Sequence, residues 1–355
     1  DAYLHAARRE AENYRPERAL QLVRRGLEIA ADVDSFELRN LEGDLLRSYG
    51  SIPESIEAYR AAAAVARDEV GRCAAMIGMA QGMAVTAAHR EALEMLDAAS
   101  GIADDHELTQ EQARICRTRG KIHFYRGQID ECLEANLRSL EHARASGSVE
   151  VEARALSGLA NAEYNRGRFI SAQSYFDQCL ELAREHGFGR ILAANLSMRS
   201  YVSGWQNDID SAIAGYREAT RLAPEDAVAW YNLGIALDDS GALAEARDAF
   251  ARAVALDPAH NLAWNNYGST LNRLGDEDAA LAAYLRAAEI DPGHAEAQNN
   301  AAAICIDRGE LDEARRRQPT PPIQPRSSLS ACPVPAPHSS SRCLRATRAC
   351  TAPAS

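Results

Sequence analysis

The sequence predicts an all-α chain built as an α-solenoid, a stack of antiparallel helical hairpins, and three observations predict it. A gapless internal repeat of 34 residues runs through the later part of the chain. Apolar residues, alanine above all, make up 46% of the chain and aromatic residues only 6%, which favours closely packed helices over sheets. Glycine and proline recur at the spacing expected of helix ends.

The clearest copies of the repeat begin near Trp230 and Trp264. Further equivalent pairs, each 34 residues apart, are Asn232/Asn266, Gly234/Gly268, Leu237/Leu271, Gly241/Gly275, Ala246/Ala280, Phe250/Tyr284, Ala253/Ala287 and Pro258/Pro292. This order of aromatic, Leu, Gly, Ala, aromatic, Ala and Pro resembles the tetratricopeptide repeat. The resemblance implies a right-handed superhelix of hairpins that serves as a protein-binding scaffold.

The same frame extends along the chain in both directions. A small residue at position 8 of each unit recurs at Ala7, Gly43, Ala80, Gly120, Ala160, Ser200, Gly234, Gly268 and Ala302. A second small residue, twelve positions later, recurs at Ala19, Ser55, Ala92, Cys132, Ala172, Ala212, Ala246, Ala280 and Ala314. The sequence therefore predicts nine hairpins, the first six of variable length and the last three with a period of 34.

Each type of residue in the frame has a physical reason. The small residues let the two helices of a hairpin approach closely, and a bulky residue at position 24 fills the space between successive hairpins. Those bulky residues are Val23, Tyr59, Leu96, Phe176, Tyr216, Phe250 and Tyr284, with Asn136 as the exception. Turns within hairpins are expected at Gly50, Gly127, Gly167, Gly241, Gly275 and Gly309. Proline at 224, 258 and 292 ends the second helix, and the longer units are expected to have longer second helices.

Three regions follow from this frame. Residues 1–195 are expected to hold divergent repeats of 36 to 40 residues, and residues 196–317 regular repeats of 34. Residues 318–355 are rich in Pro, Ser, Arg and Cys and are expected to be a disordered tail, or else an end replaced through a shifted reading frame. Since the chain starts at Asp1 without methionine, we expect it to be a fragment.

Charge and composition limit the partners that we expect. The net charge is -12, and residues 318–355 carry four arginines and no acid, so the first 317 residues carry -16. Such a body repels nucleic acid and anionic membranes, so we expect no nucleic-acid or membrane partner and favour basic or neutral peptides. No run of 18 apolar residues occurs, and isolated cysteines such as Cys73 and Cys305 indicate buried thiols in a reducing, cytoplasmic environment.

The sequence shows no catalytic centre. Ile115 stands where a P-loop ending at Lys121 would need its first glycine, and HExxH, Gly-x-Ser-x-Gly and zinc-type Cys/His spacings are absent. Histidines such as His123 fall singly in helical patterns. We therefore expect a chain that is not an enzyme and that holds no cofactor and no metal.

The predicted binding surface is the concave one, which in the repeat that this chain resembles is lined by the first helix of each hairpin. Asn232, Asn266 and Asn300 recur at position 6 and predict a ladder of amides, which can both donate to and accept from an extended peptide backbone. The flanking residues are Asn265, Asn299, Tyr231, Ser269, Asn272, Arg273 and Asp239. The alternative is that asparagine at position 6 serves helix packing.

The first part of the chain suggests a second resemblance. The segments Arg114–Gly120, Tyr125–Glu134, Glu152–Tyr164 and Glu185–Arg190 resemble the C-terminal helical region of bacterial adenylate/guanylate cyclases that carry an AAA-type ATPase module, from about Tyr3 to Asn195. This resemblance implies a sensory or regulatory arm of a cyclase or STAND-type signalling ATPase. The substrate-docking arm of a repeat-fused transferase is a third possibility, after a general peptide-binding scaffold.

Overall fold

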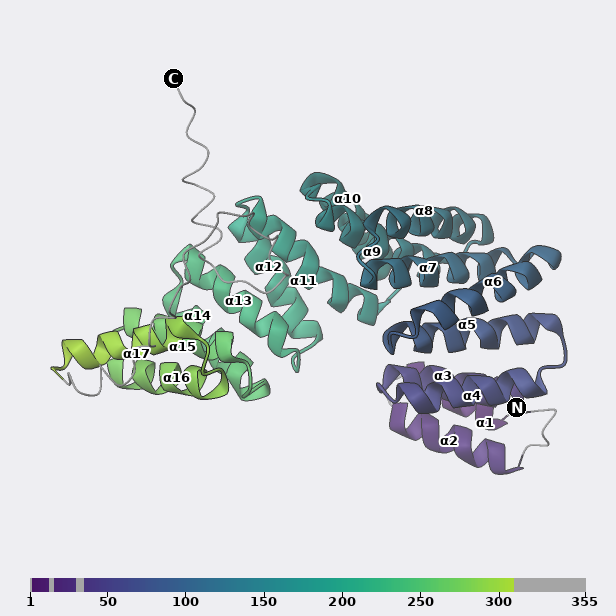
Figure 1. Ribbon diagram of the computed structural model, residues 1–355, viewed down its shortest axis with the longest axis horizontal. Coiled ribbons are helices and arrows are strands. Elements are labelled where there is room, and N and C mark those ends of the chain that lie inside the picture. Colours follow the sequence, from purple (N-terminus) through teal and green to yellow (C-terminus); the bar gives the residue numbers. More distant parts are fainter. Residues whose placement is uncertain (1, 13–15, 30–34, 310–355) are drawn as a thin grey trace, which may run out of the picture. The chain divides into compact units, whose positions relative to one another are not determined.

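The computed structural model describes residues 2–12, 16–29 and 35–309, and these residues form 17 α-helices and no strand (Figure 1). The helices are α1 (Ala2–Glu12), α2 (Pro16–Ile29), α3 (Phe36–Ser48), α4 (Ile52–Val65), α5 (Glu69–Val85), α6 (His89–Asp105), α7 (Thr109–Tyr125), α8 (Ile129–Ser146), α9 (Val149–Asn165), α10 (Phe169–Glu185), α11 (Gly189–Trp205), α12 (Ile209–Leu222), α13 (Ala227–Ser240), α14 (Leu243–Leu256), α15 (Asn261–Arg273), α16 (Glu277–Ile290) and α17 (Ala295–Asp307). The predicted fold class, an all-α solenoid of helical hairpins, is confirmed. Ala314 and the predicted tail lie outside the described residues.

The chain divides into two compact units, residues 1–191 and residues from Leu192 onward. In the first unit the packed hairpins are α1–α2, α3–α4, α5–α6, α7–α8 and α9–α10, and in the second they include α13–α14 and α15–α16. Helix α17 follows as the first helix of the ninth predicted hairpin. The division at residue 195 by repeat length stays a prediction.

The predicted frame of small residues forms the centre of both units. Every position-8 residue from Ala7 to Ala302 and every position-20 residue from Ala19 to Ala280 is buried. The position-24 residues are buried too, and Tyr59 and Phe250 are among the largest fully enclosed side chains. Small residues on both helices bring the backbones together, so that one bulky side chain fills the remaining space.

The longer repeats differ from the regular ones in both helices. The second helices α8 and α10 have 18 and 17 residues, whereas α14 and α16 have 14 each. The first helices α7 and α9 have 17 residues each, whereas α13 has 14. The expectation of longer second helices is therefore correct but incomplete, because the additional residues are shared between the two helices of a hairpin.

The turns within hairpins use left-handed backbone, as the sequence predicts. All six expected turn glycines have positive φ, for example 85° at Gly241 and 86° at Gly275. Ala87, Glu107 and Asn207 take up the same backbone region without being glycine. A left-handed residue at the end of a helix lets the chain reverse within a few residues, and most side chains disfavour that conformation.

A hydrogen bond recurs at the junction between hairpins in the second unit. The indole Nε1 of Trp230 donates to the carbonyl of Pro224 at 2.9 Å, and Trp264 does the same to Pro258 at 3.1 Å. Gln298 replaces tryptophan one repeat later, and its Nε2 donates to the carbonyl of Pro292 at 2.8 Å. Both tryptophans are only partly buried, so they stabilise the junction as well as fill space.

Trp264→Phe tests this bond apart from the packing. We expect the free energy of unfolding, measured by urea titration with circular dichroism, to fall by about 1 kcal/mol, because one hydrogen bond is lost. Trp264→Ala removes the ring as well and is expected to cost about 2–3 kcal/mol, less than a fully buried tryptophan. Equal losses for both variants would mean that the ring contributes nothing beyond its N–H group.

Gly43→Ala tests the close approach of the helices. A Cβ at Gly43 would lie 2.7 Å from the ring of Tyr59, so we expect the variant to lose about 1–3 kcal/mol through overpacking. Gly101→Ala is the matched control, because Gly101 lies within α6 with no atom within 4 Å of an added Cβ. The control is expected to gain about 0.5–1 kcal/mol from helix propensity, and the same urea titration measures both.

Candidate functional site

The first helices of the hairpins lie closer to one another than the second helices do. In the first unit α1, α3, α5, α7 and α9 each contact the next member of that series, and in the second unit α13, α15 and α17 do the same. Among the described residues, no comparable contact joins one second helix to the next. Each unit is therefore curved with its first helices on the inner face.

The three ladder asparagines lie on these first helices, on α13, α15 and α17, and are partly exposed. The Nδ2 of Asn266 donates to Tyr231 Oη at 3.3 Å, and the Nδ2 of Asn300 donates to Asn265 Oδ1 at 3.2 Å. Each bond joins position 6 of one repeat to position 5 of the repeat before. The asparagines therefore tie neighbouring repeats together and spend one amide hydrogen of each on that contact.

Two of the predicted flanking residues are buried, not exposed on a surface. Tyr231 is 7% exposed and Asn265 is 3% exposed, so a bound peptide can feel them only through the asparagines that they hold. The ring of Tyr231 packs 4.6 Å from that of His260. Burial raises the pKa of Tyr231 to about 12 although the bond from Asn266 opposes that shift, so the phenol stays protonated at neutral pH.

The other flanking residues divide into paired and solvent-facing ones. Arg273 pairs with Asp238 on α13, and Thr270 Oγ1 donates to the same carboxylate at 3.2 Å. Asn272, Arg273 and Asn299 are exposed, and Ser269 is partly exposed. Asn232 makes no hydrogen bond to any other residue in the described part of the chain, so its whole amide remains available.

A larger feature of the first unit was not predicted from the sequence. The inner face there holds a recess of about 880 Å³ between α3, α5, α7 and α9, which we name the cationic recess. Its charged lining residues are Asp44, Arg47, Arg114, Arg117, Lys121, Glu150 and Arg154. Five cations against two carboxylates give it a net charge of +3, in a chain whose net charge is -12.

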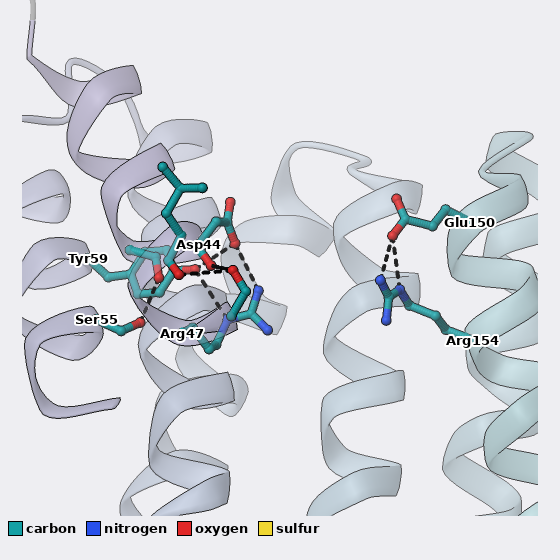
Figure 2. A network of polar contacts seen from close by, with 9 residues as sticks. Asp44, Arg47, Ser55, Tyr59, Glu150 and Arg154 are labelled. Carbon is teal, nitrogen blue, oxygen red and sulfur yellow. Dashed lines mark hydrogen bonds and ion pairs between the residues drawn. The ribbon is translucent and has the colours of Figure 1, made fainter. Parts of the chain in front are cut away.

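Two of the five cations are neutralised within the recess (Figure 2). Arg47 Nη2 donates to Asp44 Oδ1 at 2.9 Å, and Tyr59 Oη donates to the same oxygen at 2.7 Å. Across the view, Arg154 donates from Nε and Nη2 to Glu150 Oε1 at 3.0 and 2.7 Å. Both carboxylates of the recess are thus engaged with their own arginines.

The other three cations have no anionic partner. Arg114, Arg117 and Lys121 lie along α7 at positions i, i+3 and i+7, on one face of the helix, and no ion pair or hydrogen bond connects their side chains to a described residue. Burial, followed by repulsion from Arg154, Arg47 and Arg114, lowers the pKa of Arg117 to about 9. Burial and the neighbouring arginines also lower the pKa of Lys121, whose ammonium lies 5.6 Å from the ring of Tyr125.

A smaller cavity of about 290 Å³ adjoins the cationic recess and shares Arg117, Lys121 and Arg154 with it. We name it the side cavity. It exists at Asn136, where the other hairpins carry a larger side chain at position 24. Asn136 is 2% exposed and donates to the carbonyl of Cys132 at 2.8 Å. Phe124 and Tyr125 are among its other lining residues.

The cysteines and acids of the described residues suggest no chemistry. Cys73, Cys116, Cys132, Cys179 and Cys305 are buried free thiols, as the sequence predicts, and burial raises the pKa of Cys73 and Cys132 to about 11. Within the described ranges, no three His, Cys, Asp or Glu residues converge as metal ligands do. Among the same residues, no helix is both long and apolar enough to cross a membrane.

Comparisons with known proteins identify the repeats. Two family models described as tetratricopeptide repeat match the chain, one over residues 111–187 and the other over residues 206–261 and 241–295. A comparison with curated proteins finds no match. The resemblance of residues 3–195 to the helical region of cyclases stays a prediction.

Solved structures share the fold. A Rap protein complexed with competence and sporulation factor matches with a TM-score of 0.55 and 16% identity, over 78% of this chain and 80% of that one. YrrB, a TPR protein described as having an unusual peptide-binding site, matches with a TM-score of 0.45 and 21% identity, over 56% and 94% of the two chains. MamA from Desulfovibrio magneticus RS-1 matches with a TM-score of 0.44 and 22% identity, over 52% and 97%.

The sequence frame, the packed hairpins and the family matches agree with one another. Small residues recur where the helices of a hairpin touch, and left-handed glycines recur where a hairpin turns. The matched segments cover α7 to α10 and α12 to α16. The chain is a tetratricopeptide repeat protein.

Proposed function

We propose that the chain is a protein-interaction scaffold that binds an extended segment of a partner protein on the inner face of its first helices. One observation carries the proposal: polar side chains without a full set of internal partners gather on that face in each unit. Elsewhere in the fold, buried polar groups generally find a partner, as expected for a stable structure. Polar groups left open on a concave surface are available to a ligand.

The amide ladder of the second unit suits an extended backbone. Asn232, Asn266 and Asn300 recur on successive first helices, and each carries both a donor and an acceptor. Asn266 and Asn300 are held in place by their bonds to the preceding repeat, so their remaining amide groups are oriented before a ligand arrives. Such preorganisation lowers the entropy that binding costs.

The flanking residues extend this surface. Asn299, Asn272 and Arg273 are exposed and Ser269 is partly exposed, so a segment that lies along the ladder meets further donors and acceptors. Buried Tyr231 and Asn265 support the ladder from beneath. The fold also supports a binding role, since the Rap protein that shares it was solved in complex with competence and sporulation factor.

Asn232→Ala is the sharpest test of the ladder, because Asn232 makes no hydrogen bond within the described chain and its loss leaves the fold intact. Dodecapeptides selected from a random display library on the purified chain supply the ligands, and fluorescence anisotropy measures their affinity. We expect Asn232→Ala and Asn266→Ala each to weaken binding about three- to tenfold, the cost of one hydrogen bond. Circular dichroism is expected to show unchanged helicity.

Arg247→Ala is the matched control, since Arg247 is exposed on the second helix α14 and pairs with the adjacent Asp248. Its affinity for the selected peptides is expected to equal that of the parent chain. Peptides that depend on Arg247 and not on any residue of the first helices contradict the proposed function. Peptides that bind the inner face of the first unit but ignore both asparagines remove the ladder and keep the scaffold.

A further inference from the structure

The cationic recess of the first unit holds charge that the protein does not neutralise. Its two carboxylates, Asp44 and Glu150, are engaged by Arg47 and Arg154. Arg114, Arg117 and Lys121 are left with no anion in the described chain. Three unpaired cations side by side on one helix repel one another, and an unpaired charge within a recess costs free energy.

The lowered pKa of Arg117 reports that cost. Removal from water is the main cause, and the positive charges of Arg154, Arg47 and Arg114 add to it. Because the charged guanidinium is disfavoured in the folded chain, Arg117 does not stabilise the fold by its charge. Perturbed groups of this kind are concentrated at functional sites, and an anion placed among the three cations relieves the repulsion.

Neutral donors and acceptors face the same space. Gln81 on α5 is 8% exposed and lines the recess, yet its amide makes no hydrogen bond to a described residue. Asn40 on α3 also lines it, and its Oδ1 is buried without a partner. Buried amides normally find partners, so these two unsatisfied side chains are a second and independent indication that a polar ligand completes the recess.

The side cavity adds a requirement of shape. Tyr59 fills the equivalent position two hairpins earlier, where a Cβ at either Gly43 or Gly78 would meet its ring. Gly120 and Gly158 flank Asn136 in the same manner, but the smaller amide leaves about 290 Å³. Because the cavity shares three of its walls with the recess, one ligand can reach both.

We propose that the cationic recess binds an acidic segment of a partner protein, in which Asp or Glu carboxylates pair with Arg114, Arg117 and Lys121 and a neighbouring bulky apolar side chain enters the side cavity. This inference rests on the proposed scaffold function and names the class of its ligand. Guanidinium groups bind carboxylates through paired, charge-assisted hydrogen bonds. The remaining amides of Asn40 and Gln81 bind the backbone of the segment.

The overall charge of the chain argues for a short segment and against a large polyanion. At -12 the protein repels nucleic acid and anionic membranes over long distances. Within the recess the local charge is +3, and at physiological salt charges farther away than about 8 Å are largely screened. Overall charge alone favours a basic peptide, so preference for an acidic one is a discriminating observation.

Four fluorescein-labelled dodecapeptides test the proposal by anisotropy on the full chain. The first has four glutamates around a central phenylalanine, the second replaces the glutamates by glutamine, the third by lysine, and the fourth by phosphoserine. We expect the glutamate peptide to bind at least about tenfold more tightly than the glutamine and lysine peptides. Its affinity is expected to fall as salt rises, because the contact is ionic.

Arg117→Gln removes the central cation of the recess. We expect it to weaken the glutamate peptide about tenfold or more, while the melting temperature of the free chain stays the same or rises, because a repelled charge has gone. A purely structural arginine would show the opposite, a lower melting temperature. Arg138→Gln is the matched control, since Arg138 is exposed on the second helix α8 and pairs with Glu134, and neither property should change.

Asn136→Phe tests the side cavity separately. An aromatic ring at this position is expected to fill the space as Tyr59 does, and so to raise the melting temperature. We expect it to weaken the peptide with a central phenylalanine at least about fivefold and to leave a version with central alanine unchanged. Equal effects on both peptides exclude the side cavity as a subsite.

The outcomes separate this inference from the proposed function. Equal binding of the glutamate and glutamine peptides, equal effects of Arg117→Gln and Arg138→Gln, or binding of the phosphoserine peptide alone each overturns the acidic-segment proposal. Peptides selected from the random library that still need the inner face would then keep the scaffold function. Failure of every peptide to bind the first helices overturns both.

Discussion

The close approach of helices, set by small side chains at two positions of every hairpin, is the constraint on which the rest of the structure depends. Glycine, alanine, serine or cysteine occupies each described site, from Ala7 to Ala302, and each is buried. Backbones that come this close leave room for one large side chain between hairpins, such as Tyr59 between Gly43 and Gly78. The spacing also brings successive first helices into contact, and that contact creates the inner face.

The two units treat the polar side chains of that face differently. In the second unit Asn266 and Asn300 are bonded to the preceding repeat, and Arg273 pairs with Asp238. In the first unit Arg114, Arg117 and Lys121 have no such partner, although acids are abundant elsewhere in the chain. Satisfied polar contacts add to the stability of a repeat stack, whereas unsatisfied cations lower it. Only a bound ligand gives the second arrangement a compensating benefit.

Sequence reasoning succeeded where a contact repeats and failed where it joins different helices. The hairpin frame could be predicted because close packing demands the same small residues at the same spacing, and the turn glycines because left-handed backbone favours glycine. The positions of Asn232, Asn266 and Asn300 on first helices followed from that frame. The burial of Tyr231 and Asn265 did not, because it depends on the neighbouring repeat. The cationic recess was missed because net charge averages over the chain, while Arg47 and Arg154 join Arg117 only after folding. Asn136 was visible as an exception, but its cavity requires the two flanking glycines to be placed.

The bond from Trp230, Trp264 and Gln298 to a proline carbonyl six residues earlier has a consequence for how such a chain changes over generations. Each regular repeat carries both halves of this junction, together with its own turn glycine and its own filling side chain. A repeat is therefore a self-contained cassette, and each cassette meets only its neighbours. Duplication or loss of one whole cassette preserves every contact in register, so a chain of this kind can lengthen or shorten its binding face without inventing a new interface.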